Sequence, residues 1–195
     1  IHKSRYARWL DEEGRREDWS ETVDRYFDYM SRWIEEKHGV PVTKPELDEL
    51  KEAVLNLEIM PSMRALMTAG KALERNHLAA FNCSYLPIDH PLAFDELLYI
   101  LMCGTGVGFS VERNNVDKLP VVSDTFENKN ICIEVEDSKE GWAQAFRELV
   151  TMLYDGHVPY WDLSALRPAG ERLKTFGGRS SGPQPLNELF SFTVS

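Results

Sequence analysis

The sequence predicts an α/β protein with a helical N-terminal region at residues 1–60 and a strand-and-helix region at residues 61–195. Up to Met60, apolar side chains recur at helical spacing, and beyond Pro61 short apolar runs alternate with helical patterns. Such alternation is typical of a parallel sheet or barrel with helices outside. Three or four candidate strands are too few to close a barrel. Because the chain end also carries no capping signal, we expect a piece of a longer polypeptide or of a split subunit.

Two helices are expected in the N-terminal region. The first begins after Asp18, which forms a capping box with Glu21, and ends at Gly39. The second begins at the Thr43–Glu46 capping box with Pro45 in its first turn and runs to the break at Met60-Pro61. Their apolar faces are formed by residues three or four apart: Val23, Phe27, Met30 and Ile34 in the first, and Leu47, Leu50, Val54 and Leu57 in the second.

The second region alternates strands with helices. Strands are expected at 80–86, 107–112, 131–135 and 160–163, and helices at 91–102, 138–154 and from Pro185 to the end. Asp89 can cap the helix that starts near Pro91, and Gly156 can end the helix of residues 138–154. The latter helix has one apolar face, made of Trp142, Phe146, Leu149 and Leu153. The segment 114–130 is polar and rich in turn residues, which favours a mobile excursion.

Charge and hydropathy exclude several classes of partner. The chain has 22 basic and 32 acidic residues and a net charge of -10, which would repel nucleic acid polymers and anionic membranes. The longest apolar stretch, Leu92 to Val107, is interrupted by Asp95 and Glu96 and by two glycines, so it is too short and too polar to span a bilayer. No signal peptide opens the chain, so we expect a cytoplasmic, reducing setting and no membrane.

The three cysteines, Cys83, Cys103 and Cys132, fit neither a zinc motif nor a disulfide framework. As free thiols, each is either a small core residue or a reactive group. Cys83 lies in the middle of an apolar strand, where Phe81 and Tyr85 would share its side if it faced a barrel interior. The five histidines are scattered without ligand spacing, so no metal site is expected.

Two glycine-rich stretches have alternative interpretations. The run from Gly104 to Ser110 follows a helix and opens a strand, the reverse of a dinucleotide-binding fingerprint. It is therefore either a place where backbone approaches a ligand or a tight turn. The loop from Phe176 to Pro183 holds Arg179 and two serines before a helix, and it can contact phosphate or be an ordinary flexible loop.

The order of several short strings resembles the adenosylcobalamin-dependent ribonucleoside-triphosphate reductases over essentially the whole chain. The strings are Tyr6-Ala7-Arg8-Trp9-Leu10, Gly14-Arg15, Trp19-Ser20-Glu21-Thr22-Val23, Pro61-Ser62-Met63-Arg64, Asn82-Cys83, Asp95-Glu96-Leu97, the run Gly104 to Ser110, Asp137-Ser138-Lys139-Glu140-Gly141-Trp142, Asp162-Leu163-Ser164 with Arg167-Pro168, and the loop Phe176 to Pro185.

This resemblance implies the first half of a ten-stranded α/β barrel, incomplete in this chain, and ribonucleotides as substrates. It implies that Cys83, on the first barrel strand, is one of two thiols that reduce the ribose, and that a thioredoxin-like reductant resets them. The second thiol and the radical cysteine would lie past Ser195, and adenosylcobalamin would be bound mainly outside this segment. Cys103 and Cys132 match no family cysteine, so we interpret both as structural.

The resemblance also assigns binding residues and one departure. Ser62, Asn82 and Gly106 fall where the family contacts substrate, while Asp89, Arg113, Arg179 and Ser180 are candidates for binding a deoxynucleotide effector. Monomeric members carry a long insertion after the strand at 107–112, whereas a short segment joins Asn114 to Ile131 here. We therefore expect effector binding at a homodimer interface. An alternative is a non-catalytic nucleotide-binding half of a split subunit, completed by a C-terminal partner chain.

Overall fold

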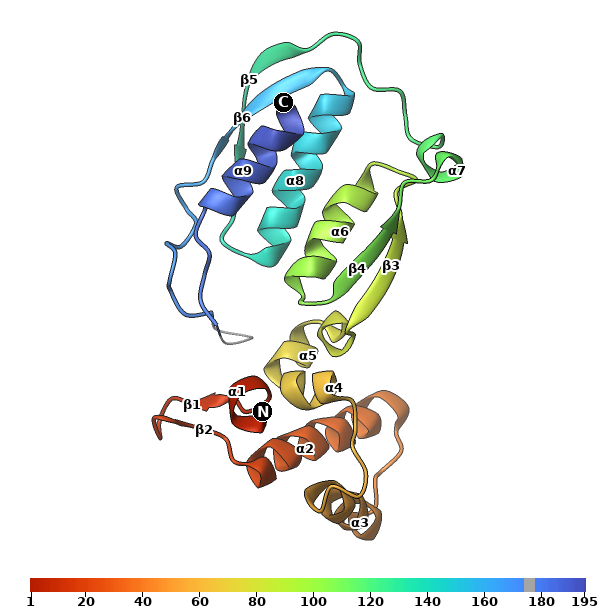
Figure 1. The fold of residues 1–195 in the computed structure, drawn as a ribbon, viewed down its shortest axis with the longest axis vertical. Coiled ribbons are helices and arrows are strands. Elements are labelled where there is room, and N and C mark those ends of the chain that lie inside the picture. Colours follow the sequence, from red (N-terminus) through yellow and green to blue (C-terminus); the bar gives the residue numbers. More distant parts are fainter. Residues whose placement is uncertain (174–177) are drawn as a thin grey trace. The chain divides into compact units, whose positions relative to one another are not determined.

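The computed structural model describes residues 1–173 and 178–195, which form two compact units (Figure 1). The first, called here the helical unit, comprises residues 1–82. The second, the strand unit, comprises residues 83–173 and 178–195. Each unit has its own hydrophobic core, so each is described separately.

The helical unit consists of short and long helices around one small hairpin. Its elements are α1 (His2–Arg5), β1 (Trp9–Leu10), β2 (Arg15–Arg16), α2 (Trp19–His38), α3 (Lys44–Leu55), α4 (Met63–Thr68), α5 (Lys71–Arg75) and the 3-10 helix η1 (His77–Ala80). Strands β1 and β2 pair antiparallel. One core joins α2 to α3 through Val23, Phe27 and Val54, and another joins α2 to α5 and η1 around Tyr29 and Leu73.

The predicted starts of α2 and α3 are confirmed, but the predicted end of α3 is wrong. Both capping boxes form, and Gly39 ends α2 in the left-handed conformation at φ 64°. Helix α3 stops at Leu55, and Leu57 adopts φ 61° with 65% of its surface exposed. Because α3 packs on α2 with one side only, Leu50 is also exposed, although its spacing predicts a buried position.

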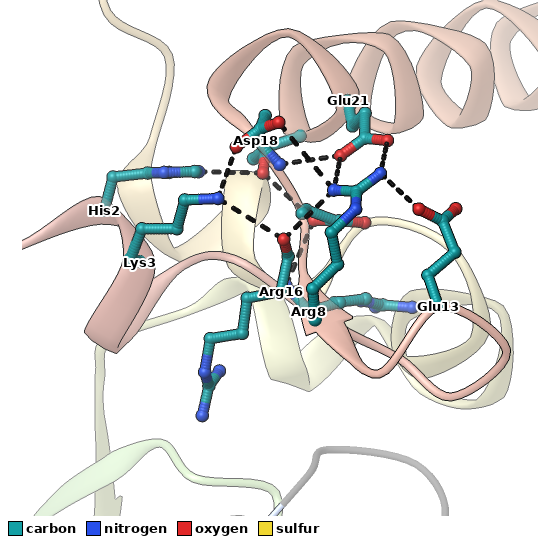
Figure 2. A network of polar contacts seen from close by, with 10 residues as sticks. His2, Lys3, Arg8, Glu13, Arg16, Asp18 and Glu21 are labelled. Atoms are coloured by element: carbon teal, nitrogen blue, oxygen red, sulfur yellow. Dashed lines mark hydrogen bonds and ion pairs between the residues drawn. The ribbon is translucent and has the colours of Figure 1, made fainter.

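A network of polar contacts ties the N-terminal hairpin to the first turn of α2 (Figure 2). The Arg15 guanidinium donates to both carboxylate oxygens of Glu21, at 2.8 and 2.7 Å, and also pairs with Glu13 at 2.6 Å. Lys3 in α1 pairs with Asp18, the residue that caps α2. The charged residues in this stretch thus hold α1, the hairpin and α2 together.

The strand unit alternates strands and helices, as the sequence predicts. Its elements are β3 (Cys83–Pro87), α6 (Leu92–Met102), β4 (Gly106–Ser110), α7 (Arg113–Val116), β5 (Glu127–Glu134), α8 (Lys139–Tyr154), β6 (His157–Asp162) and α9 (Gln184–Val194). Strands β3 and β4 form one parallel pair and β5 and β6 another. Within the described residues these pairs are separate two-stranded sheets, so the expected ten-stranded barrel is not established.

Helices α8 and α9 build the core of the strand unit over the β5–β6 pair (Figure 1). Phe190 of α9 stacks on Phe146 of α8 with ring centroids 6.0 Å apart, and Trp161 of β6 meets Phe190 edge-on at 5.4 Å. The four residues predicted to form the apolar face of α8 all belong to this cluster, which confirms that face. Helix α6 packs on α8 and also on β3 and β4, and so connects the two pairs.

Three local predictions for the strand unit are corrected by the structure. Strand β3 begins at Cys83, because residues 77–80 form η1 under the Asn76 cap. Pro91, and not Asp89, occupies the N-cap of α6. The polar segment 114–130 is partly ordered, because Asn115 of α7 is buried and donates to Ser110 Oγ at 3.0 Å, and because β5 already begins at Glu127. No helix among residues 1–173 and 178–195 is long and apolar enough to cross a bilayer.

Candidate functional site

Cys83 is the first residue of β3 and lies directly opposite Gly106, the first residue of β4. Side chains alternate between the two faces of a strand, and exposure alternates here in the same way. Cys83 and Tyr85 are exposed, whereas Ser84 and Leu86 are half-buried. The face that carries Cys83 is therefore the open face of the pair.

The environment of Cys83 is compatible with thiol chemistry. Helix α6 packs against the β3–β4 pair (Figure 1). Cys83 is exposed and therefore not buried beneath this helix. Tyr85 shares the side of Cys83, as predicted, but Phe81 precedes the strand. A solvent-accessible thiol can undergo thiol–disulfide exchange, whereas a buried one is inert. The core-cysteine interpretation of Cys83 thus does not hold in the strand unit as described.

Two of the three predicted substrate residues, Ser62 and Asn82, lie in the helical unit. Ser62 is the N-cap of α4, and its Oγ accepts a hydrogen bond from the Ala65 amide at 3.3 Å. Asn82 is exposed and lines a cavity of about 630 Å³ whose walls include Met63 and Arg64, the two residues after Ser62. The structure therefore places Asn82 beside the segment that Ser62 opens, while Gly106 belongs to the strand unit.

Asp89 and Arg113, two predicted effector residues, follow the ends of β3 and β4 respectively. The carboxylate of Asp89 is half-buried and pairs with Lys118 Nζ at 3.5 Å, and His90 Nε2 lies 3.8 Å from its other oxygen. Arg113 is the first residue of α7. Lys118 was not among the predicted site residues, because it lies in the polar segment 114–130 that was interpreted as mobile. Its basic charge, next to Asp117 in the turn after α7, was the one available signal.

Arg179 and Ser180 lie beside residues 170–172, to which they are connected by backbone contacts. Arg172 and Arg179 form an antiparallel bridge, and Arg179 Nη1 donates to the Gly170 carbonyl at 2.7 Å. Ser180 Oγ accepts from the Gly182 amide at 3.0 Å. The predicted loop begins at Phe176, and residues 174–177 lie outside the described part of the chain.

The other two cysteines have different surroundings. Cys103 is fully buried, and Lys139 Nζ donates to its Sγ at 3.3 Å. Cys132 is half-buried in β5 opposite Tyr160 of β6. All three cysteines are free thiols. Among the described residues, histidine, cysteine and acidic side chains form no group of three that could hold a metal ion.

Two arginines of the helical unit, Arg5 and Arg64, were also missed as candidates. Both line the cavity that contains Asn82. Arg64 is part of the motif Pro61-Ser62-Met63-Arg64, on which the family resemblance partly rests. Its position in a cavity depends on how α1 and α4 pack, which cannot be predicted from the spacing of residues in the sequence.

Two family models match the chain. One, described as the insertion domain of B12-dependent ribonucleotide reductase, matches residues 107–193. The other, the ribonucleotide reductase alpha domain, matches residues 1–71. The two matches lie in separate parts of the chain and name the same class of enzyme.

Curated proteins that are similar to this chain are also named as ribonucleotide reductases. A putative adenosylcobalamin-dependent ribonucleoside-triphosphate reductase of Mycobacterium phage D29 is 28% identical over 98% of this chain and 31% of its own length. The enzyme of Lactobacillus leichmannii is 27% identical over 95% of this chain and 33% of its own length. The latter match extends over 247 residues, although this chain has 195, so that relative carries residues without a counterpart here.

A solved structure agrees in fold. The crystal structure of a B12-dependent (class II) ribonucleotide reductase superposes with a TM-score of 0.85 and 25% sequence identity, over 98% of this chain and 35% of that chain. This chain therefore spans about a third of the length of the relatives that it matches.

Proposed function

Because this chain belongs to the adenosylcobalamin-dependent ribonucleotide reductases and corresponds to the N-terminal part of their catalytic chain, we propose that the protein reduces ribonucleotides. The substrates are ribonucleoside di- or triphosphates, and Cys83 supplies one thiol of the reducing pair. The observation that supports this role is the exposed thiol of Cys83 on the open face of the β3–β4 pair, opposite a glycine.

The proposed reaction needs two electrons and two thiols. Cys83 and a second cysteine outside this chain segment each lose a hydrogen atom and become joined by a disulfide bond. The ribose loses its 2′-hydroxyl as water and gains a hydrogen at that carbon. A thioredoxin-like reductant then reduces the disulfide, which returns both thiols for the next turnover.

Binding roles are proposed for the remaining predicted residues. Ser62, Asn82 and Gly106 contact the substrate. Asp89, Arg113, Arg179 and Ser180 contact a deoxynucleotide effector, which binds at a homodimer interface. The greater length of the matching region in the Lactobacillus leichmannii relative supports this last point, because it fits an insertion that is shortened here.

Adenosylcobalamin, the cofactor named for the relatives, is larger than either of the two cavities described in the helical unit. The cavities of about 630 and 430 Å³ in the helical unit have the size of a drug-like ligand, far below that of a corrinoid, and are lined by charged side chains. We therefore propose that adenosylcobalamin is bound mainly outside this chain segment, as the family resemblance implies.

The test is ribonucleotide reduction by the complete protein with adenosylcobalamin added or withheld. We expect Cys83→Ser to abolish multiple-turnover reduction, because serine cannot form the disulfide. Cys132→Ser is the matched control, since it removes a strand thiol of the same unit and should retain turnover. Undiminished turnover by Cys83→Ser would remove this residue from the reaction. Nucleotide binding without reduction by any form of the protein would favour the non-catalytic half of a split reductase.

A further inference from the structure

We propose that Glu17 and Arg25, a largely buried ion pair of the helical unit, are positioning residues that fix α4 and thereby hold the Ser62 hydroxyl against the ribonucleotide. This inference rests on the proposed function, in which Ser62 is a substrate contact. Ser62 is the N-cap of α4, and residues of the same helix line the cavity that contains Asn82. The affinity for the nucleotide then depends on two side chains that do not contact it.

Helix α4 is too short to keep its place by itself. It has six residues, Met63–Thr68, and an isolated helix of this length is not stable in water. At about 1.5 Å per residue it extends over only about 9 Å, so a displacement of its C-terminal end is passed on to its first turn. Contacts that fix the C-terminal end of α4 therefore also fix the position of Ser62.

Two guanidinium groups hold the C-terminal end of α4. Arg25 Nη1 donates to the carbonyls of Leu66 and Ala69, in both cases at 3.0 Å. Arg8 Nη2 donates to the Thr68 carbonyl at 3.0 Å. The last carbonyls of a helix have no partners within the helix, and positive charge stabilises that end. The two arginines thus provide hydrogen bonds that α4 cannot make itself.

One buried carboxylate, that of Glu17, holds both arginines. Its two oxygens accept from Arg25 Nε and Nη2 at 2.7 and 2.9 Å, and the backbone amide of Arg8 donates to it at 3.1 Å. The Thr22 hydroxyl donates to the same carboxylate at 3.0 Å. Burial and the charge of Arg25 lower the pKa of Arg8 to about 10, so its guanidinium stays charged at neutral pH. Because Glu17 occupies two nitrogens of Arg25, the third meets α4 from one defined direction.

Another arginine of α2 provides the comparison. Arg32, two helical turns after Arg25, pairs with Glu74 of α5. The side chains of Arg32 and Glu74 are 55% and 48% exposed, whereas those of Arg25 and Glu17 are 16% and 5% exposed. Exposed ion pairs contribute little, because water and salt compete with them. The Arg25–Glu17 pair therefore differs from a surface pair in its burial and in its bonds to α4.

The experiment measures KM and kcat for cytidine di- and triphosphate with the complete protein and adenosylcobalamin. Arg25→Lys keeps the positive charge, but a single nitrogen cannot replace the fork that bonds Glu17 and the α4 carbonyls together. We expect KM to rise about tenfold, the effect of one lost hydrogen bond to the substrate, with kcat unchanged. A merely structural role would lower kcat through loss of folded enzyme and leave KM at its wild-type value. Arg32→Lys is the matched control and should change neither constant.

A double-mutant cycle links the effect of Arg25 to Ser62. Ser62→Asn keeps an N-cap, because asparagine caps helices as well as serine does, but it removes the hydroxyl. In this background Arg25→Lys should raise KM no further, since the contact that it displaces is already absent. Calorimetric dissociation constants of cytidine diphosphate give the same cycle without turnover. Arg8→Lys, which removes the other guanidinium from the end of α4, should behave like Arg25→Lys, so the test does not depend on the stability of one variant.

Three results would overturn the positioning role: an unchanged KM in both Arg25→Lys and Arg8→Lys, an equal rise in KM with and without Ser62→Asn, or the same rise in Arg32→Lys. The failure of the proposed function is a separate outcome. It would appear as undiminished reduction by Cys83→Ser, whatever the KM of the arginine variants.

Discussion

Cys83 of β3 and Gly106 of β4 are direct neighbours across a parallel strand pair, so the residue opposite the thiol contributes no side chain of its own. Neighbouring strands lie only about 4.8 Å apart, so a side chain at residue 106 would stand next to the sulfur. The pairing therefore explains why a glycine at the start of β4 matters to a cysteine 23 positions earlier in the chain.

The first prediction concerns this neighbour of Cys83. Gly106→Val should slow alkylation of Cys83 by iodoacetamide several-fold and reduce nucleotide turnover, because the branched side chain covers one side of the thiol. Peptide mass spectrometry distinguishes the alkylation of Cys83 from that of Cys103 and Cys132. Gly108→Val is the control, since it places the same side chain beside Tyr85. Equal rates for Cys83 in the wild type and Gly106→Val would contradict the role given to the glycine.

The second prediction concerns the ion pair between α6 and α8. Asp95 is 3% exposed in its side chain, and its Oδ2 accepts from Arg147 Nε and Nη2 at 3.0 and 2.7 Å. No hydrogen-bond partner is found for Asp95 Oδ1 among the described residues. Arg147→Ala would therefore leave a buried, uncompensated carboxylate and should lower the free energy of unfolding by about 2–3 kcal/mol.

A double variant separates this charge effect from lost packing. Asp95→Ala combined with Arg147→Ala removes the buried charge together with its partner, so it should be more stable than Arg147→Ala alone. Urea unfolding of both variants gives the comparison. If the double variant is the less stable of the two, the Asp95 carboxylate contributes through contacts other than Arg147.

Local rules predict the long helices of this fold from sequence. The capping boxes at Asp18 and Thr43 and the hydroxyl of Ser138 set the starts of α2, α3 and α8, because they satisfy backbone amides within one turn. The short helices α4 and α5 were not predicted. With six and five residues they bury few side chains and depend on contacts with the rest of the helical unit.

The candidate site is only partly predictable for the same reason. Cys83 and Gly106 belong to sequence motifs that resemble those of the reductase family. Because side chains alternate between the two faces of a strand, Cys83 and Tyr85 were also predicted to lie on one face of β3. The pairing of Asp89 with Lys118 brings together residues 29 positions apart. Arg5 and Arg64 likewise line the same cavity as Asn82, although they lie far apart in the sequence. Such contacts arise from tertiary packing, which no spacing within a single element encodes.

The third prediction concerns Gly141 in the first turn of α8. A Cβ atom built at this position would lie 2.5 Å from the Glu136 carbonyl oxygen, closer than van der Waals contact allows. Gly141→Ala should therefore lower the free energy of unfolding by about 1–3 kcal/mol, although alanine has the higher helix propensity. Gln144→Ala, at an exposed position in the same helix, should change the stability little. Thermal unfolding measures both, and a gain in stability for Gly141→Ala would show that the 136–141 turn can relax.

The fourth prediction concerns Glu17, a buried carboxylate in the helical unit. Arg25 Nε and Nη2 donate to its two oxygens at 2.7 and 2.9 Å, and the Arg8 amide and the Thr22 hydroxyl donate to Oε2. Burial raises the pKa of Glu17, but the hydrogen bonds and the charge of Arg25 together outweigh it, so the pKa lies below its usual 4.5. The folded helical unit thus favours the ionised carboxylate.

Stability at acid pH follows from this direction. Because folding lowers the pKa of Glu17, its ionised carboxylate stabilises the folded state. This stabilisation is fully present above pH 4.5 and is lost as the pH falls through the pKa that Glu17 has in the folded protein. Glu17→Gln should destabilise the helical unit by about 2 kcal/mol at pH 7, and the deficit relative to the wild type should shrink as the pH falls below 4.5. Hydrogen exchange of the α2 amides, followed by mass spectrometry at several pH values, reports the helical unit specifically. A deficit that stays constant from pH 7 to the acid range would show that Glu17 acts through shape rather than through its charge.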